Sequence, residues 1–256
     1  MMPVALVISG FDPANHAGFG SDIRVMTTLG VHPVGVITTL TVQIPGRFDA
    51  AWSVDPKKIS KQLQLLFSYY PIRAIKIGML QSVEVCKAIL PFLGQFSGPI
   101  VLDPLLHASA GPALLDKNAR VLFKNKILRH ATLVTPNLPE MLWLLGEKKT
   151  FPKLELCLRF FNQFKIPVLL KGGHALDTKF VEDIFFDGKK TKRWKRPRLK
   201  NLITHGTGCF LSSAITAYLA RGFKPVGAID AAQKKLSYSL KNPIQIDKIK
   251  YLSHHF

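Results

Sequence analysis

The stretch VALVISG, residues 4–10, is apolar at nearly every position and ends in a serine and a glycine. A strand with one face in water alternates apolar and polar residues, so an unbroken apolar run indicates a strand buried on both faces. Similar runs recur at PVGVITTLTV (33–42), AIKIGML (74–80), PIVLDP (99–104), ATLVTPN (131–137) and IPVLLKGG (166–173). The sequence therefore predicts a mainly parallel central sheet.

Longer amphipathic segments separate these runs. Their apolar spacing predicts helices at Pro56–Tyr70, Ser82–Phe96, Leu138–Gly146 and Leu154–Phe164. Alternating strands and helices are typical of a three-layer α/β/α sandwich. The segment FVEDIFFDGKKTKRW, residues 180–194, predicts an antiparallel hairpin that turns at Asp-Gly. No linker, repeat or low-complexity segment interrupts the pattern, so we expect residues 1–256 to form a single domain.

Composition narrows the class of protein. No apolar run approaches the roughly 18 residues that a transmembrane helix needs, so we expect no membrane partner. The N-terminal MMPVALVISG has no basic region and no small-residue cleavage site, which favours a first strand over a signal peptide. The three cysteines, Cys86, Cys157 and Cys209, are far apart and form no CxxC pair. This argues against a disulfide framework and for a reducing cytoplasm.

Positive charge is the outlying property, with 35 Lys and Arg against 16 Asp and Glu and a formal net charge of +19. Part of it lies in GKKTKRWKRPRLK, residues 188–200, which contains Trp194. Basic residues around an aromatic can form a nucleic-acid patch, but the same run also suits a solvated hairpin. No nucleic-acid-binding motif accompanies the run, which favours the hairpin.

Polar residues gather where the predicted strands end. The successive strand ends read SGFDPANHAGFGSD, TVQIPG, GML, LDPLLHASAG, TPNLPE and KGGH, followed later by THGTGC. In a parallel α/β sheet, ligands bind outside the carboxyl ends of the strands. We therefore expect the functional site at this edge.

The stretch THGTGCF, residues 204–210, leads into an apolar helix-like segment. Gly206 and Gly208 leave backbone N–H groups free to bind an anion at the positive end of the helix dipole. A cysteine in the first turn, Cys209, is expected to have a lowered pKa and could accept the proton of an attacking hydroxyl. The alternatives are an ordinary glycine-led helix start and a buried structural cysteine, the interpretation we give to Cys86 and Cys157.

The motifs GFDPANHAGFGSD, KIGML, VLDP, TPNLPE, KGGH and THGTGC together resemble the hydroxymethylpyrimidine and phosphomethylpyrimidine kinases of thiamine biosynthesis, which are ribokinase-like. The resemblance extends from about Val4 to Leu240. It implies ATP and Mg²⁺ as cofactors, and transfer of the γ-phosphoryl group to the hydroxymethyl of a 4-amino-2-methylpyrimidine and then to its monophosphate. It also implies a homodimer.

The resemblance further implies roles for individual residues. Gly206 and Gly208 would form the anion hole, and Cys209 would act as general base where many sugar kinases carry aspartate. Magnesium and nucleotide would be bound by residues of the other motifs: Asp103 and Glu140 for the metal, and Asn137, Lys171, Thr204, His205 and Thr207 for the nucleotide. As an alternative for one motif, NLPE also predicts a helix N-terminus, with Pro139 near its first position. Lys171 could likewise be a strand-end lysine exposed to water.

On the pyrimidine side, the amide of Gln43 complements a ring nitrogen next to an exocyclic amine. The resemblance adds Asp22 as a second polar anchor, with Gly10, Met79 and the region of Val42 as walls. Alternatively, Gln43 is a surface amide and Met79 a core residue. The chain departs from the usual family pattern at two places in this pocket: Asn15 and His16 replace glycines, and Ile44 and Pro45 replace a small polar pair.

Three other functions compete with this prediction. A pyridoxal kinase shares the fold and the anion hole, although the better-known ones carry aspartate at the position of Cys209. A Cys/His hydrolase would use Cys209 with His205, but no third residue or oxyanion partner is apparent. A nucleic-acid-binding protein would use the basic run 188–200.

Overall fold

The computed structural model describes residues 1–106, 114–173, 179–199, 205–246 and 249–253. Within these ranges, nine strands form one sheet in the order β3-β2-β1-β4-β5-β6-β7-β8-β9, and two form a small hairpin, β10-β11. The strands are β1 Val4–Phe11, β2 His32–Ile44, β3 Arg47–Ser53, β4 Ile72–Ile77, β5 Ile100–Leu102, β6 Leu133–Val134, β7 Val168–Leu170, β8 Phe180–Phe186, β9 Thr191–Pro197, β10 Ile244–Ile246 and β11 Ile249–Tyr251. Strands β2, β1, β4, β5, β6 and β7 run parallel, and β3, β8 and β9 are antiparallel additions at the two edges.

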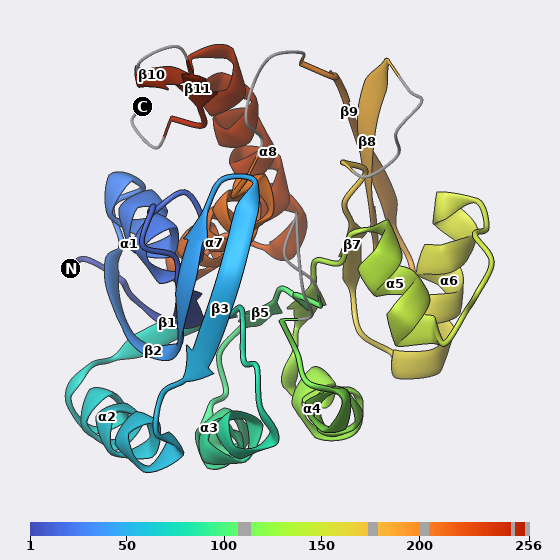
Figure 1. Ribbon diagram of the computed structural model, residues 1–256. Helices are drawn as coiled ribbons and strands as arrows, with labels where there is room; N and C mark the ends of the chain where they lie inside the picture. The colour runs from blue at the N-terminus through green and yellow to red at the C-terminus, as the bar shows by residue number, and fades with distance from the viewer. Residues whose placement is uncertain (107–113, 174–178, 200–204, 247–248, 254–256) are drawn as a thin grey trace.

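Helices cover both faces of the sheet, which gives the three layers that the sequence predicted (Figure 1). The α-helices are α1 Gly18–Thr28, α2 Pro56–Tyr69, α3 Val83–Gln95, α4 Lys117–Leu122, α5 Leu138–Leu145, α6 Lys153–Phe164, α7 Thr207–Ala220 and α8 Pro225–Lys241. A π-helical turn, Phe123–Ile127, and a 3-10 turn, Leu128–His130, follow α4. Helices α1, α7 and α8 lie on one face, and α2 to α6 lie on the other.

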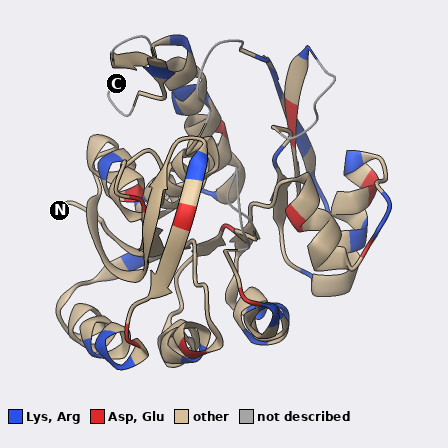
Figure 2. Ribbon diagram, in the orientation of Figure 1, with Lys and Arg blue, Asp and Glu red and all other residues tan. Residues whose placement is uncertain are grey.

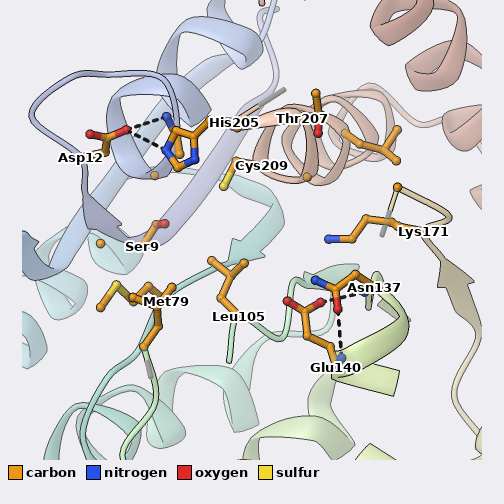
Figure 3. Close-up of a pocket in the computed structure, with 18 of the residues that line it drawn as sticks. Ser9, Asp12, Met79, Leu105, Asn137, Glu140, Lys171, His205, Thr207 and Cys209 are labelled. Atoms are coloured by element: carbon orange, nitrogen blue, oxygen red, sulfur yellow. Dashed lines mark hydrogen bonds and ion pairs between the residues drawn. The ribbon is translucent and has the colours of Figure 1, made fainter. Parts of the chain in front are cut away.

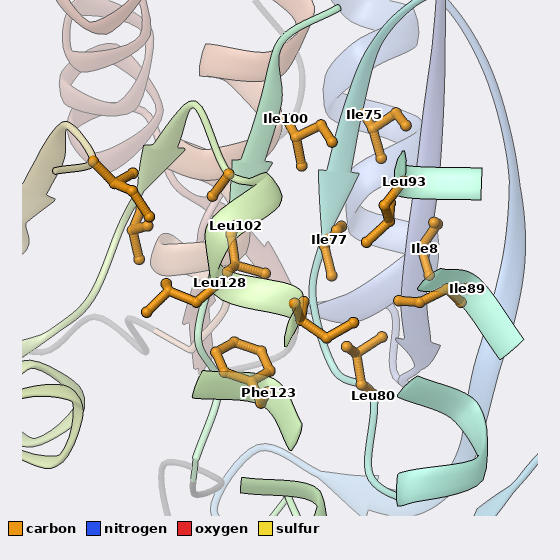
Figure 4. Packing of buried hydrophobic residues seen from close by; sticks show 14 of the residues in the cluster. Ile8, Ile75, Ile77, Leu80, Ile89, Leu93, Ile100, Leu102, Phe123 and Leu128 are labelled. Carbon is orange, nitrogen blue, oxygen red and sulfur yellow. The ribbon is translucent and has the colours of Figure 1, made fainter. Parts of the chain in front are cut away.

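Successive residues of the central strands point into different cores. Leu6 and Ile8 of β1 join the core beneath α2 to α6, whereas Ala5 and Val7 join the core beneath α1, α7 and α8. Figure 4 shows part of the first core, where Ile75 and Ile77 of β4 lie among side chains from the neighbouring strands and helices. Strands buried on both faces explain the unbroken apolar runs in the sequence.

Local capping explains where several helices begin. The Asp55 carboxylate accepts a hydrogen bond from the Lys57 N–H at the start of α2, with Pro56 in the first turn. The Ser82 hydroxyl accepts from the Val85 N–H at the start of α3. These two helices therefore begin at or next to the predicted residues. Helix α1, the hairpin β10-β11 and the edge strand β3 were not predicted.

The predicted hairpin is confirmed as β8 and β9, and β9 forms one edge of the sheet. Its exposed residues Arg193 and Lys195 give the edge positive charge, which discourages pairing with the strand of another molecule. Trp194 points inward, and its indole N–H donates to Asp230 of α8 at 2.9 Å. Its ring therefore packs against α8 and is not presented to a base, which argues against the nucleic-acid interpretation.

Lysine and arginine are spread over several parts of the molecule, including α2, α4 and the β8-β9 hairpin (Figure 2). None of the helices in the described ranges has the length and hydrophobicity required to span a bilayer.

Candidate functional site

A cavity of about 830 Å³ opens at the carboxyl ends of the parallel strands, where the sequence predicted the site. Strand β1 delivers Ser9 and Gly10 near its carboxyl end, and four other central strands deliver a lining residue just beyond theirs: Met79 after β4, Leu105 after β5, Asn137 after β6 and Lys171 after β7. Thr41 and Gln43 reach the cavity from the long strand β2, which continues past the others. Figure 3 shows Ser9, Met79, Leu105, Asn137 and Lys171 converging from separate elements.

The N-terminus of α7 forms one wall of this cavity. Gly206 caps the helix with φ 86° and ψ −7°, and its carbonyl accepts from the Phe210 N–H at 2.8 Å. Thr207 and Gly208 follow in the first turn and also line the cavity. Their N–H groups have no helical acceptor at this end, so the helix start offers donors and a positive dipole to an anion. The predicted anion hole therefore has the geometry it requires.

Lys171 adds a positive charge at the same place. Its Nζ lies 3.1 Å from the point that a Cβ on Gly208 would occupy. The ammonium group also bonds Asp103 Oδ1 at 2.6 Å, and Asp103 and Glu140 raise the pKa of Lys171 despite its burial. The lysine is therefore charged and fixed beside the helix start, and it is not the water-exposed strand-end residue of the alternative interpretation.

Asp103 is fully buried and has its oxygens engaged. Oδ1 accepts from Lys171 and from the Thr135 hydroxyl at 3.2 Å, and Oδ2 accepts from the Ser212 hydroxyl at 3.2 Å. The carboxylate positions Lys171 and the first turns of α7. Its predicted role as a metal ligand is not supported by this arrangement.

Asn137 and Glu140 form a capping box at the start of α5. The Asn137 side chain accepts from the Glu140 N–H at 2.9 Å, and Glu140 Oε2 accepts from the Asn137 N–H at 2.8 Å. The helix start that NLPE predicted is thus confirmed, yet both residues also line the cavity. Burial raises the pKa of Glu140 to about 7, and Lys171 opposes this effect.

The site offers few oxygen ligands for Mg²⁺. In the described part of the chain, no group of three or more histidine, cysteine or acidic side chains is arranged to hold a metal ion. Glu140 is the carboxylate at the cavity wall beside Lys171. Mg²⁺ commonly keeps several waters and is held through one or two carboxylates and the phosphates of the nucleotide. A site with one carboxylate fits that mode of binding but does not bind the metal alone.

Cys209 lies in the first turn of α7, lines the cavity and is 6% exposed. The expected lowering of its pKa by the helix dipole is wrong for the free protein. Burial raises the pKa of the Cys209 thiol to about 11, while Lys76 and the Gly18 N–H act in the opposite direction. Desolvation of the thiolate therefore outweighs the favourable helix start when no ligand is present.

On the pyrimidine side, Gly10, Gln43 and Met79 all line the cavity as predicted. A Cβ on Gly10 would lie 2.9 Å from Met79 Sδ, so the glycine allows the methionine to pack flat against β1. The region of Val42 lines the cavity through its neighbours Thr41 and Gln43, whereas the Val42 side chain itself lies on the opposite face of β2 and is 44% exposed. Asn15 has φ 58°, so it adopts the left-handed conformation that a glycine would adopt at that position.

Asp22 does not reach the cavity. Its side chain is fully buried, bonds Lys76 Nζ at 2.6 Å and accepts from the Ser213 hydroxyl at 2.6 Å. The prediction that it contacts the pyrimidine directly is therefore wrong in this structure. Its partner could not be predicted from the sequence, because Lys76 is 54 residues away on β4.

His205 contacts Asp12, with 3.5 Å between Nε2 and Oδ2, as Figure 3 also shows. Asp12 also accepts hydrogen bonds from the Ala14 and Ala17 N–H groups. Burial alone would raise the pKa of Asp12, but the contact with His205 and these two hydrogen bonds outweigh it and lower the pKa of Asp12. His205 is thus oriented by Asp12, which disfavours the Cys/His hydrolase. Thr204 lies outside the described residues.

Three residues of the site were missed from the sequence. Asp12 orders the first loop, and Asp183 and Arg196 line the far end of the cavity, 2.8 Å apart. Asp12 lies within the quoted loop motif, and Arg196 lies within the basic run, so each was visible but had no assigned partner. Asp183 also accepts from the Gly172 N–H at 2.7 Å, which fixes the loop after Lys171.

Comparisons with known proteins show the family to which the chain is similar. A family profile described as phosphomethylpyrimidine kinase matches residues 12–254. The hydroxymethylpyrimidine/phosphomethylpyrimidine kinase of Aquifex aeolicus is 33% identical over 248 residues, covering 96% of this chain and 97% of the relative. A pyridoxal kinase from Staphylococcus aureus in complex with ADP superimposes with a TM-score of 0.88 at 26% identity, over 99% of this chain and 94% of that one. A phosphomethylpyrimidine kinase from Clostridium difficile gives a TM-score of 0.79 at 28% identity, over 94% and 100%.

The close approach at Gly206 yields a first prediction. A Cβ there would clash with the His16 carbonyl oxygen, so in Gly206→Ala the start of α7 must shift relative to the first loop. Gly222→Ala is the matched control, since Gly222 has a similar φ of 89° and nothing within 4 Å of its Cβ position. We expect Gly222→Ala to cost about 1–2 kcal/mol of unfolding free energy without loss of nucleotide binding. Gly206→Ala should lose nucleotide binding measured by calorimetry, and equal binding by the two variants would contradict the anion hole.

Proposed function

The chain belongs to the phosphomethylpyrimidine kinase family, and we propose that it phosphorylates 4-amino-5-hydroxymethyl-2-methylpyrimidine and its monophosphate with ATP. The observation that carries the proposal is the arrangement of one cavity with an anion site in its middle. Gly206 to Gly208 and Lys171 supply that site. Along the sheet, Gln43 of β2 and Met79 after β4 lie on one side of Lys171, which follows β7, and Asp183 of β8 and Arg196 of β9 lie on the other side. This order suits an acceptor, a transferring phosphoryl group and a nucleotide in line.

The residues of the chain divide the reaction between them. Cys209 accepts the proton of the hydroxymethyl group, whose oxygen forms a bond to the γ-phosphorus as the bond to the ADP oxygen breaks. The N–H groups at the start of α7 and the Lys171 ammonium stabilise the charge on the transferring group. Mg²⁺, held by the nucleotide with Glu140, supplies further neutralisation of the β- and γ-phosphates when bound. His205 and Thr207 border the nucleotide.

We also propose a reducing cytoplasm as the compartment, because all three cysteines are free thiols.

Pyridoxal kinase activity is the second candidate function, favoured by the close superposition on the Staphylococcus aureus enzyme. Its substrate is also a flat heteroaromatic ring that carries a hydroxymethyl group, so the described cavity accommodates the same chemistry.

Release of ADP with competing substrates tests the proposal directly. We expect hydroxymethylpyrimidine and its monophosphate to support turnover with a higher kcat/KM than pyridoxal. Cys209→Ala should lower turnover by about 10²–10⁴-fold, the usual range for removal of a general base, while ATP still binds. A kcat/KM that is higher for pyridoxal would reject the pyrimidine and retain the kinase. Full activity of Cys209→Ala would reject the thiol as base.

Gln43 provides a separate test of substrate recognition. Gln43→Leu keeps the volume but removes the amide, which leaves the polar edge of the pyrimidine unpaired at a cost of about 1–3 kcal/mol. We expect affinity for the pyrimidine to fall by about 10- to 100-fold and affinity for ATP to stay unchanged. The control is Gln62→Leu, the same replacement at an exposed position of α2, which should change neither affinity. Equal weakening of both ligands by Gln43→Leu would instead indicate a structural residue.

We also propose that the protein is a homodimer that pairs through the outer face of the β2-β3 hairpin. Leu40, Val42 and Ile44 alternate on this face, and Trp52 lies opposite Leu40 in the register. All four are more than 40% exposed, with Trp52 at 60% and Ile44 at 59%. A second copy related by a two-fold axis would cover the same residues on both chains and so remove this apolar surface from water.

Sedimentation at micromolar concentration checks this proposal. We expect wild-type protein to sediment as a dimer and Trp52→Glu as a monomer, because the charge would be buried without a partner. Leu65→Glu is the control, since Leu65 is 65% exposed on α2, away from the hairpin, and should leave the dimer intact. A monomeric wild type, or dissociation by both variants, would contradict the assignment of this face.

A further inference from the structure

Lys76 is a charged residue in the middle of a core strand. It lies on β4 between Ile75 and Ile77, which face the core beneath α2 to α6. Its side chain is fully buried on the opposite face, which α1 and α7 cover. Burial of a charge is costly unless it is paired, and Asp22 of α1 supplies the pair at 2.6 Å.

The ammonium group of Lys76 lies directly behind the cavity wall. Its Nζ is 3.5 Å from the hydroxyl of Ser9, which lines the cavity. It is also 2.8 Å from the point that a Cβ on Gly78 would occupy, and the next residue, Met79, lines the cavity. One layer of atoms therefore separates this charge from the space that ligands occupy.

The same pair is joined to the helix that carries the thiol. Asp22 accepts from the Ser213 hydroxyl at 2.6 Å through its second oxygen. Ser213 follows Cys209 by four residues on α7, so the two side chains lie on one face of the helix. Cys209 is consequently positioned one helical turn from the contact between α7 and the buried pair.

Four charged groups interact electrostatically with the Cys209 thiol. They come from four different elements: Asp22 from α1, Lys76 from β4, Asp103 after β5 and Lys171 after β7. Cys209 and the carboxylates Asp22 and Asp103 keep the pKa of Lys76 above its ordinary value although burial lowers it, so the ammonium stays charged. Without Lys76, a thiolate would lie near two carboxylates with Lys171 as the remaining cation among these groups.

We propose that Lys76, held by Asp22, is a positioning residue that supplies the counter-charge for the Cys209 thiolate. The inference rests on the proposed function for its consequence in catalysis. In the step itself the hydroxyl O–H bond breaks and an S–H bond forms, while the O–P bond forms and the bond from phosphorus to ADP breaks. Lys76 keeps its proton throughout and contacts neither substrate. The positive charge of Lys76 stabilises the Cys209 thiolate, whose formation is opposed by burial.

Alkylation of Cys209 by iodoacetamide, followed by peptide mass spectrometry, measures the thiolate directly. In the wild-type protein the rate should still be rising at about pH 10, because the pKa of this thiol is raised to about 11. The informative comparison is between Asp22→Asn, which keeps Lys76, and the double variant Lys76→Met with Asp22→Asn. The double variant removes both charges and so leaves no buried carboxylate unpaired.

The alkylation rate of Cys209 should differ between Asp22→Asn and the double variant. In Asp22→Asn, Lys76 has lost its carboxylate and should pair with the thiolate, so alkylation at a fixed pH of about 8 should be about tenfold faster than in wild type. The double variant should be at least about tenfold slower than Asp22→Asn and should lose kcat with little change in KM. Ser213→Ala removes a hydrogen bond to Asp22 without changing any charge, and it should alkylate at close to the wild-type rate.

A purely structural role for the pair gives a different pattern. Equal alkylation rates in Asp22→Asn and the double variant, with both folded by circular dichroism, would overturn the proposal. Equally large changes in Ser213→Ala would do the same, since they would reflect packing. The alkylation readout needs neither ATP nor a pyrimidine, so its outcome is independent of substrate identity. Failure of the substrate assays would reject the proposed function and leave the electrostatic inference intact.

Discussion

The site depends on one constraint, the fixed position of helix α7 against the sheet. From Cys209 to Ala220 every residue of this helix is buried, because the sheet lies on one side and α1 and α8 pack around the others. A helix enclosed in this way cannot be amphipathic, and its polar residues must bond within the protein. Ser212 bonds Asp103 and Ser213 bonds Asp22, so the two serines fix the rotation of the helix. Its N-terminus then points at the carboxyl edge of the sheet, where phosphates can reach it.

Those serines connect α7 to two buried ion pairs, of which one reaches the cavity and the other does not. Lys171 with Asp103 reaches the cavity, and its ammonium remains available to an anion. Lys76 with Asp22 is sealed behind the wall and can act only through its field. Replacing such a sealed pair with apolar residues is often neutral or stabilising in other proteins. Its presence next to the thiol that we propose as general base is therefore better explained by electrostatics at Cys209 than by stability.

Much of the fold could be predicted because its signals are local. Ser82 and Asn137 mark helix starts because each side chain caps the N–H group three residues later. The buried strands could be recognised because nearly every residue in them is apolar. The errors concern partners distant in sequence. Asp22 resembled a ligand contact because its neighbours are glycines and polar residues, whereas Lys76 decides its role. In the region of Val42, Thr41 and Gln43 line the cavity and Val42 does not, because successive side chains of a strand point to opposite faces. The expected pKa of Cys209 was wrong because burial depends on the whole fold.

The charges around Cys209 also explain why a thiol suits this position in place of a carboxylate. Asp22 and Asp103 are balanced by Lys76 and Lys171, so the groups behind the helix start sum to zero charge when the thiol is protonated. An aspartate at position 209 would add a third carboxylate to a buried site with two lysines, and its desolvation would raise its own pKa. A thiol is neutral at rest and acquires its charge only when the proton is removed. The charges around Cys209 are therefore balanced while the thiol is protonated, and the site carries an extra negative charge only when Cys209 is ionised.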